Sequence, residues 1–116
     1  MNEILEQALL YDFYGELLNE HQKEIYEQVL LEDLSLGEIA AEQGISRQAV
    51  HDLVRRCRKT LEGYEEKLHL VERFLAVKSD VQEIDDVLAR WESGAKDANE
   101  AAARIRELTG QILGNM

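Results

Sequence analysis

The middle of the chain gathers the residue types that proteins use to contact DNA. Residues 46–59 hold five basic side chains and one acidic one, whereas the whole chain has 13 basic and 24 acidic residues and a net charge of −11. Arginine and glutamine on a helix in the major groove can pair with guanine and adenine edges, and later basic residues can meet phosphates. The candidates near bases are Arg47, Gln48, His51 and Arg55, and those near phosphates are Arg56, Arg58 and Lys59.

Residues 35–59 would position these side chains, because they have the pattern of two short helices joined by a tight turn. Ser35 can cap the first helix, with Glu38 three residues later completing a capping box. Gly44 suits the turn, where a positive φ costs little without a Cβ. Ser46 can cap the second helix. The pattern predicts a helix-turn-helix motif whose second helix is the recognition helix.

The same pattern has a second interpretation, in which the charged residues form an ordinary solvated face and the motif serves protein contacts. The sequence pI of about 4.6 argues against tight DNA binding, because a DNA-binding domain is usually basic. At physiological salt, however, charges more than about 8 Å away are largely screened. A basic recognition helix can therefore act on an acidic protein if its face meets the DNA first.

The composition favours an all-α fold with no enzymatic chemistry. The chain has 116 residues, no proline, 45% hydrophobic and 32% charged residues. The three histidines and the single cysteine do not have metal-ligand spacing, and no phosphate loop or catalytic constellation is present. We therefore predict no metal, no cofactor and no catalytic residue, and we expect Cys57 to be a small core residue. Without an apolar run long enough to cross a bilayer, the expected location is cytoplasmic.

The segment before the motif is predicted to form two helices. Residues 3–18 form an apolar first helix that should be buried on several sides, either by a partner or by later helices of the same chain. Asn19 and Gln22 give a capping signal for the next, supporting helix. Residues 1–34 contain nine acidic residues and one lysine, which predicts an acidic face able to attract a basic protein surface or to be simply solvated.

The segment after the turn has a heptad seam, with apolar residues separated alternately by four and three positions. The seam consists of Val50, Val54, Cys57, Leu61, Tyr64, Leu68, Val71 and Leu75. It predicts that the recognition helix continues well past Lys59, or restarts near Gly63, and packs lengthwise on another helix. That helix is either the first helix of the same chain or a second copy in a homodimer.

The C-terminal part of the chain has two more capping signals. Ser79 with Gln82 and Asp97 with Glu100 mark helix starts, so residues 79–113 read as a helical hairpin that closes the core, pairs two chains or docks a partner. The expected organisation is a helical helix-turn-helix domain over residues 1–78 and a C-terminal hairpin over residues 79–116.

Several of these segments together resemble the YlxM-type family of small bacterial helix-turn-helix proteins. The matching residues are Tyr11 to Gly15, Leu17 and Leu18, Gln22, Asp33 to Leu36, Glu38 to Ala40, Ser46 to Val50 with Asp52, Leu61, Tyr64, Glu65, Lys67 and Leu68. The motif itself is similar to the C-terminal DNA-binding region of sigma factors. The resemblance implies an all-helical, dimeric DNA-binding or regulatory protein. It also implies a link to the signal recognition particle pathway, with components of that particle as partners.

Two hypotheses follow from the sequence. The first is a DNA-binding regulator that places the recognition helix of residues 46–59 in the major groove. The alternative is a non-enzymatic accessory protein that acts through protein or RNA–protein contacts, for which the family resemblance suggests the signal recognition particle pathway.

Overall fold

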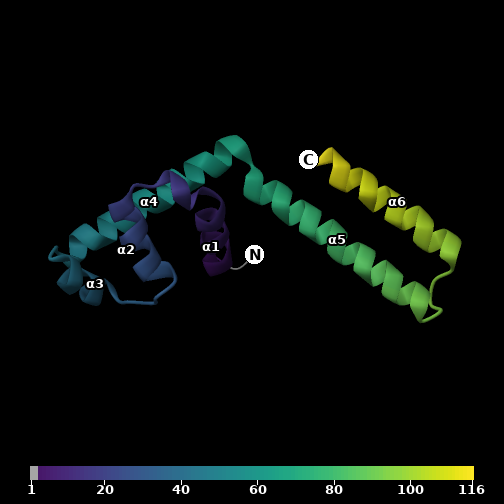
Figure 1. The fold of residues 1–116 in the computed structure, drawn as a ribbon, viewed down its shortest axis with the longest axis horizontal. Coiled ribbons are helices and arrows are strands. Elements are labelled where there is room, and N and C mark those ends of the chain that lie inside the picture. The colour runs from purple at the N-terminus through teal and green to yellow at the C-terminus, as the bar shows by residue number, and fades with distance from the viewer. Residues whose placement is uncertain (1–2) are drawn as a thin grey trace. The chain divides into compact units, whose positions relative to one another are not determined.

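The chain is helical along almost all of the part that the structure, a computed structural model, describes, residues 3–116 (Figure 1). No strand occurs within these residues. The all-α prediction is therefore confirmed. The elements are α1 (Glu3–Tyr14), the 3-10 turn η1 (Gly15–Leu17), α2 (Glu20–Leu30), α3 (Leu36–Gln43), α4 (Arg47–Leu68), α5 (Leu70–Glu92) and α6 (Ala98–Gly114).

These elements form two compact units that meet in sequence at residues 69 and 70. His69 ends α4 in the left-handed region, at φ 56°. The helix start that the sequence predicts at Ser79 is wrong, because this residue lies in the interior of α5. The expected division of the chain between residues 78 and 79 also falls inside this helix. A serine caps a helix only where the preceding chain leaves helical geometry, and no glycine or proline interrupts the helix-compatible residues around Ser79.

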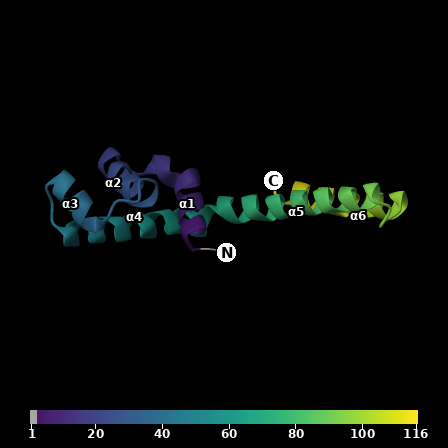
Figure 2. The same ribbon diagram turned by 90° about the horizontal axis from the view of Figure 1, so that it is seen from below.

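The first unit is organised around α4, which contacts α1, α2 and α3 (Figure 1). In a second view α2 and α3 lie on one side of α4 (Figure 2). Helix α4 continues through Gly63, so the prediction that the recognition helix runs past Lys59 is confirmed and no restart occurs near Gly63. The buried apolar residues of this unit are Leu10, Tyr14, Leu18, Ile25, Tyr26, Ile39, Ala40, Val50, Val54, Cys57 and Leu61.

Helix α1 is shorter and less covered than its apolar sequence predicted. It buries Gln7, Leu10 and Tyr14, whereas the side chain of Leu5 is 50% exposed. The helix ends at Tyr14 because the chain tightens into η1 at Gly15, where a Cβ would lie 2.8 Å from the Tyr11 ring. Glycine therefore allows the close approach of this ring to the backbone.

The second unit is a hairpin in which α5 and α6 run antiparallel (Figure 1). Val87 on α5 and Ala101 and Leu108 on α6 are buried. Arg104 forms ion pairs with Glu83 across the hairpin and with Glu107 one turn later. The predicted helix start at Asp97 is confirmed, since its side chain accepts a hydrogen bond from the Glu100 N–H at 2.8 Å. None of the helices within residues 3–116 combines the length and apolar character needed to span a bilayer.

Candidate nucleic-acid interface

Helices α3 and α4 form the predicted helix-turn-helix, and local hydrogen bonds fix both of its helix starts. The Ser35 hydroxyl accepts from the Glu38 N–H at 3.1 Å while the Glu38 carboxylate accepts from the Ser35 N–H at 3.3 Å. Gly44 ends α3 at φ 69°. The Ser46 hydroxyl then accepts from the Ala49 N–H at 3.0 Å. Capping and a glycine turn therefore determine where α4 begins and how it leaves α3.

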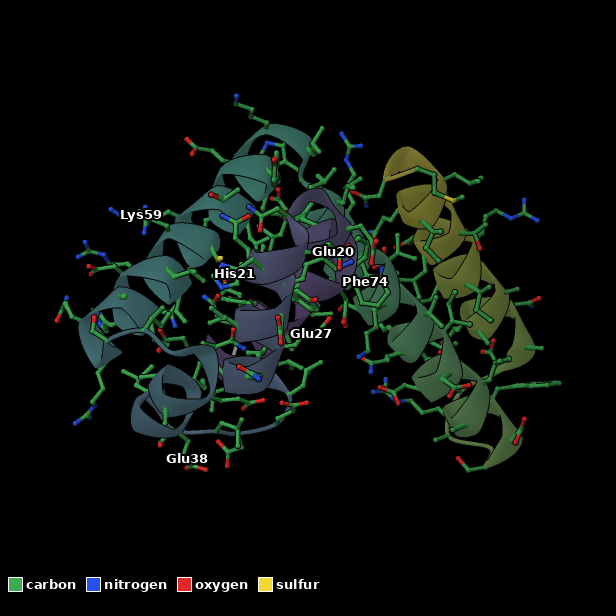
Figure 3. The ribbon with its side chains drawn as sticks, turned by 60° about the vertical axis from the view of Figure 1, so that its left-hand side comes forward. Glu20, His21, Glu27, Glu38, Lys59 and Phe74 are labelled. Carbon is green, nitrogen blue, oxygen red and sulfur yellow. The ribbon has the colours of Figure 1, made fainter. Side chains whose placement is uncertain are left out.

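The exposed face of α4 gathers five of the seven predicted DNA-contacting residues. Gln48, His51, Arg55 and Lys59 follow one another at spacings of three and four residues, which places them on one side of a helix. All four are exposed, and Lys59 extends away from the helix in Figure 3. Arg47 lies beside them at the first position of α4. We call these five residues the recognition stripe.

A shallow hollow lies at the N-terminal end of the stripe. It has a volume of about 420 Å³ and is lined by Leu36, Arg47, Gln48 and His51. Leu36 and Arg47 are the first residues of α3 and α4, so the N-terminal turns of both helices meet here. Helix N-termini carry a partial positive charge, and Arg47 adds a full one. The hollow therefore suits a phosphate oxygen at the edge of a groove.

Asp52 is the acidic residue beside the stripe, and it is engaged with two of its neighbours. Its Oδ1 accepts a hydrogen bond from Nε2 of Gln48 at 3.0 Å. The same oxygen lies 3.7 Å from Nδ1 of His51, which is too far for a hydrogen bond but close enough for an ion pair when the imidazole is protonated. The Gln48 amide is therefore oriented by a neighbour one helical turn away.

Arg56 and Arg58 are also exposed, and both follow Arg55 on α4. Arg58 lines a different hollow, of about 370 Å³, together with residues from α1 and from the end of α2. Burial raises the pKa of Tyr26, and the positive charge of nearby Arg58 partly offsets that rise. Arg58 is thus placed between α4 and the first two helices, about two helical turns beyond His51 along α4.

Cys57 faces the interior of the first unit, as predicted for a core residue. Burial raises the pKa of its thiol, which disfavours the reactive thiolate, and the nearby charge of Arg56 acts in the opposite direction. Within residues 3–116 no cluster of histidine, cysteine and carboxylate side chains could hold a metal ion.

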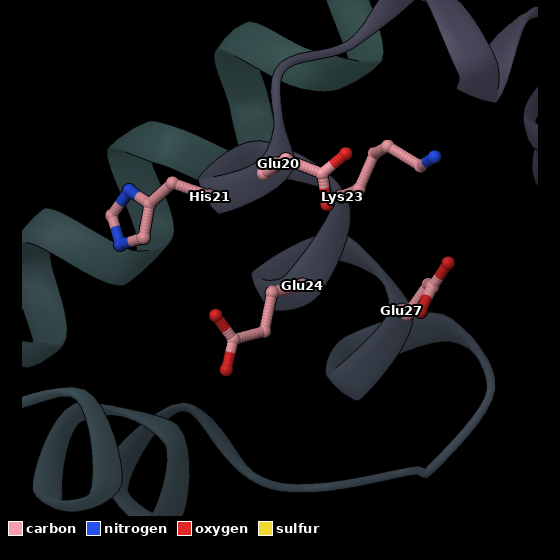
Figure 4. A pocket seen from close by; sticks show the side chains of 5 residues that line it. All are labelled: Glu20, His21, Lys23, Glu24 and Glu27. Carbon is pink, nitrogen blue, oxygen red and sulfur yellow. The ribbon is translucent and has the colours of Figure 1, made fainter.

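Helix α2 carries the predicted acidic face, which surrounds a hollow of about 580 Å³ (Figure 4). Its lining residues are Glu20, His21, Lys23, Glu24 and Glu27. Lys23 is paired with Glu16 at 3.1 Å. Glu27 accepts a hydrogen bond from the Tyr11 hydroxyl, so this carboxylate also joins α1 to α2. Sequence reasoning missed this second role, because a contact between residues 16 apart has no local signal.

Comparison with known proteins places the chain in a family. A family model described as "Putative helix-turn-helix protein, YlxM / p13 like", UPF0122, matches residues 1–101. The chain belongs to this family. The UPF0122 protein of Desulforamulus reducens is 42% identical over 113 residues, covering 97% of this chain and 95% of that protein. The UPF0122 protein of Acetivibrio thermocellus is 50% identical over 84 residues, covering 72% of each chain.

A third relative has similar length. The UPF0122 protein of Symbiobacterium thermophilum is 42% identical over 106 residues, which cover 91% of this chain and 97% of that protein. The UPF0122 match confirms the family resemblance that the sequence motifs indicated, and it includes the whole helix-turn-helix.

Proposed function

We propose that this UPF0122 chain is a non-enzymatic regulatory protein that binds DNA with the N-terminal half of α4 in the major groove. The observation that carries the proposal is the recognition stripe, an exposed face on which Arg47, Gln48, His51 and Arg55 follow a helix-turn-helix junction. In helix-turn-helix proteins the first turns of the second helix meet base edges. Arg47 and Arg55 then pair with guanine, and Gln48 pairs with adenine.

Phosphate contacts supply part of the affinity. Lys59 lies in the stripe beyond the base-reading residues, and Arg56 and Arg58 flank it. If about three phosphates are neutralised, the logarithmic salt slope of binding is about −2.7. This is a modest electrostatic contribution, as expected for a chain whose net charge is −11. Base contacts and the pairing of two chains provide the remaining affinity.

Pairing of two copies is the second part of the proposal, and α5 supports it. Val77, Val81, Ile84, Leu88 and Trp91 repeat at spacings of four and three residues. Although α6 packs on α5, Val81 is 52% exposed, Leu88 36% and Trp91 48%. We call these five residues the α5 seam. A partly exposed seam of this kind is self-complementary in a two-fold dimer, where two hairpins pack as a four-helix bundle. A homodimer also matches the symmetry of many DNA sites.

Fluorescence anisotropy tests DNA binding directly. The purified chain is titrated into labelled genomic fragments and into a random duplex at two salt concentrations, and so is Arg47→Ala/Arg55→Ala. Lys78→Ala/Arg90→Ala is the matched control, because it removes the same charge from exposed positions on α5. We expect selective binding by the wild type and the control but not by the stripe variant. Equal binding by all three proteins, or no binding at low salt by a folded wild type, would contradict the proposal.

The acidic hollow on α2 supports a second candidate function, the binding of a basic protein surface. This is the kind of contact that an accessory protein of an RNA–protein assembly, such as the signal recognition particle, would make. Charge reversal at Glu20, Glu24 and Glu27 should then weaken salt-sensitive protein association. Unchanged association in those variants would rule out the acidic face as the contact surface.

A further inference from the structure

Asp52 holds an unusual position for an acidic residue, on the side of α4 that the basic stripe occupies. It is the sole acidic residue between positions 46 and 59. Its side chain is 42% exposed, and its Oδ1 faces both the Gln48 amide at 3.0 Å and the His51 ring at 3.7 Å. A carboxylate next to a DNA phosphate is repelled, so this residue weakens binding to any duplex.

The hydrogen bond that Gln48 donates to Asp52 connects this carboxylate to base recognition. A glutamine amide has two N–H groups and one carbonyl oxygen. One N–H is taken by Asp52, which leaves one N–H and Oε1 for a base. Adenine presents N7 as an acceptor and N6 as a donor in the major groove, and a bidentate glutamine uses one donor and one acceptor to match them. Because this hydrogen bond already restricts the Gln48 side chain, the side chain loses less rotamer freedom when it binds DNA.

We propose that Asp52 is a specificity-determining positioning residue: it orients the Gln48 amide to read adenine, at the cost of a lower affinity of the recognition stripe for the phosphates of any duplex. The inference rests on the proposed DNA binding and deepens it, because it assigns a base to Gln48 and a reason for an acidic residue on this face. The orientation of the Gln48 amide raises the ratio of specific to non-specific binding, which is the quantity that matters for site selection, whereas the Asp52 charge lowers the affinity for all duplexes alike.

The test uses the duplex that the wild-type chain selects from a random pool, the same duplex with each A·T pair replaced in turn by G·C, and a scrambled duplex. Asp52→Ala removes both the charge and the acceptor, whereas Asp52→Asn removes the charge and keeps a carbonyl acceptor. Both variants should bind the scrambled duplex about threefold more tightly, the effect of one unit charge about 7 Å from a phosphate in water. Asp52→Ala should also lower the preference for one A·T pair by about tenfold, and Asp52→Asn by less.

A double-mutant cycle separates positioning from a general structural effect. In the Gln48→Ala background, Asp52→Ala should no longer change the preference for that A·T pair, because no amide remains to be oriented. Helical circular dichroism confirms that each variant is folded. An unchanged A·T preference in folded Asp52→Ala would overturn the positioning role and leave the proposed DNA binding intact. Failure of the wild type to select any duplex over the scrambled one would overturn both.

Discussion

The Tyr14 hydroxyl donates a hydrogen bond to the Glu65 carboxylate, with 2.5 Å between the two oxygens. This bond joins the last residue of α1 to the last turn of α4. The Tyr14 side chain is 1% exposed, and its ring lies 6.0 Å from that of Tyr64 between centroids. The C-terminal end of α4 is therefore held by α1, while the recognition stripe lies before it, between Arg47 and Lys59.

Loss of this bond should weaken the first unit. We expect Tyr14→Phe to lower the free energy of unfolding by about 1–2 kcal/mol, because hydrogen bonds to charged groups contribute more than neutral ones. Urea denaturation followed by circular dichroism measures the change. Glu65→Gln retains an acceptor and serves as the control, with a smaller loss. An unchanged urea midpoint in Tyr14→Phe would show that the bond does not contribute to stability.

The turn of the helix-turn-helix should depend on a glycine at position 44. Gly44 has φ 69°, so Gly44→Ala should destabilise the protein by about 1 kcal/mol or more. Gly63 lies inside α4, where an added Cβ would meet no atom within 4 Å. Gly63→Ala should therefore stabilise the protein by about 0.5–1 kcal/mol. Thermal unfolding of both variants provides the comparison, and changes of the same sign would contradict this account of the turn.

Alkaline pH should weaken the contact between α1 and α2. Burial, followed by the hydrogen bond to Glu27 and its negative charge, raises the pKa of Tyr11 well above the usual value near 10. The folded state thus favours the protonated phenol. Its contribution to stability is complete below about pH 10 and is lost as pH rises from the unfolded pKa through the folded one.

Urea midpoints between pH 8 and 11 measure this linkage. Compared with the wild type, Tyr11→Phe should be less stable at pH 8 and should lose less stability as the pH increases. The comparison between the two proteins isolates Tyr11, since the chain has four tyrosines and the other three are present in both proteins. Parallel pH profiles would mean that the raised pKa of Tyr11 has no thermodynamic effect.

Dimerisation through the α5 seam predicts a mass of two chains in sedimentation equilibrium. Val81→Glu places a charge on the seam and should shift the protein toward the monomer. Gln82→Glu adds the same charge at the neighbouring exposed position, outside the seam, and should remain a dimer. If the wild type sediments with the mass of one chain, 13.3 kDa, the α5 seam does not pair two copies.

Helix starts were predictable from sequence wherever a capping side chain followed a break in the helical pattern. Asn19, Ser35, Ser46 and Asp97 each accept the expected backbone hydrogen bond. The junction between α4 and α5 at His69 was not predictable from the sequence. Histidine rarely adopts a positive φ, so the residue type does not indicate one, and this conformation depends on how the helices pack.

The recognition stripe was also predictable, since residues 48, 51, 55 and 59 share one side of any α-helix. The position of Arg58 was not, because it depends on where α1 and α2 pack around α4. The contact between Gln48 and Asp52 has the spacing of one helical turn and could have been found from sequence. It was missed because the acidic residue was counted only as a charge.

Amide NMR tests most directly whether DNA contacts the exposed face at the start of α4. The isotopically labelled chain is titrated with a selected duplex, and the shifted amide signals are mapped onto the structure. We predict that the largest shifts fall between residues 46 and 59 and at the start of α3, with little change in α6. Shifts confined to other helices, or no shifts in the folded protein at low salt, would contradict the assignment of α4 as a DNA-reading helix.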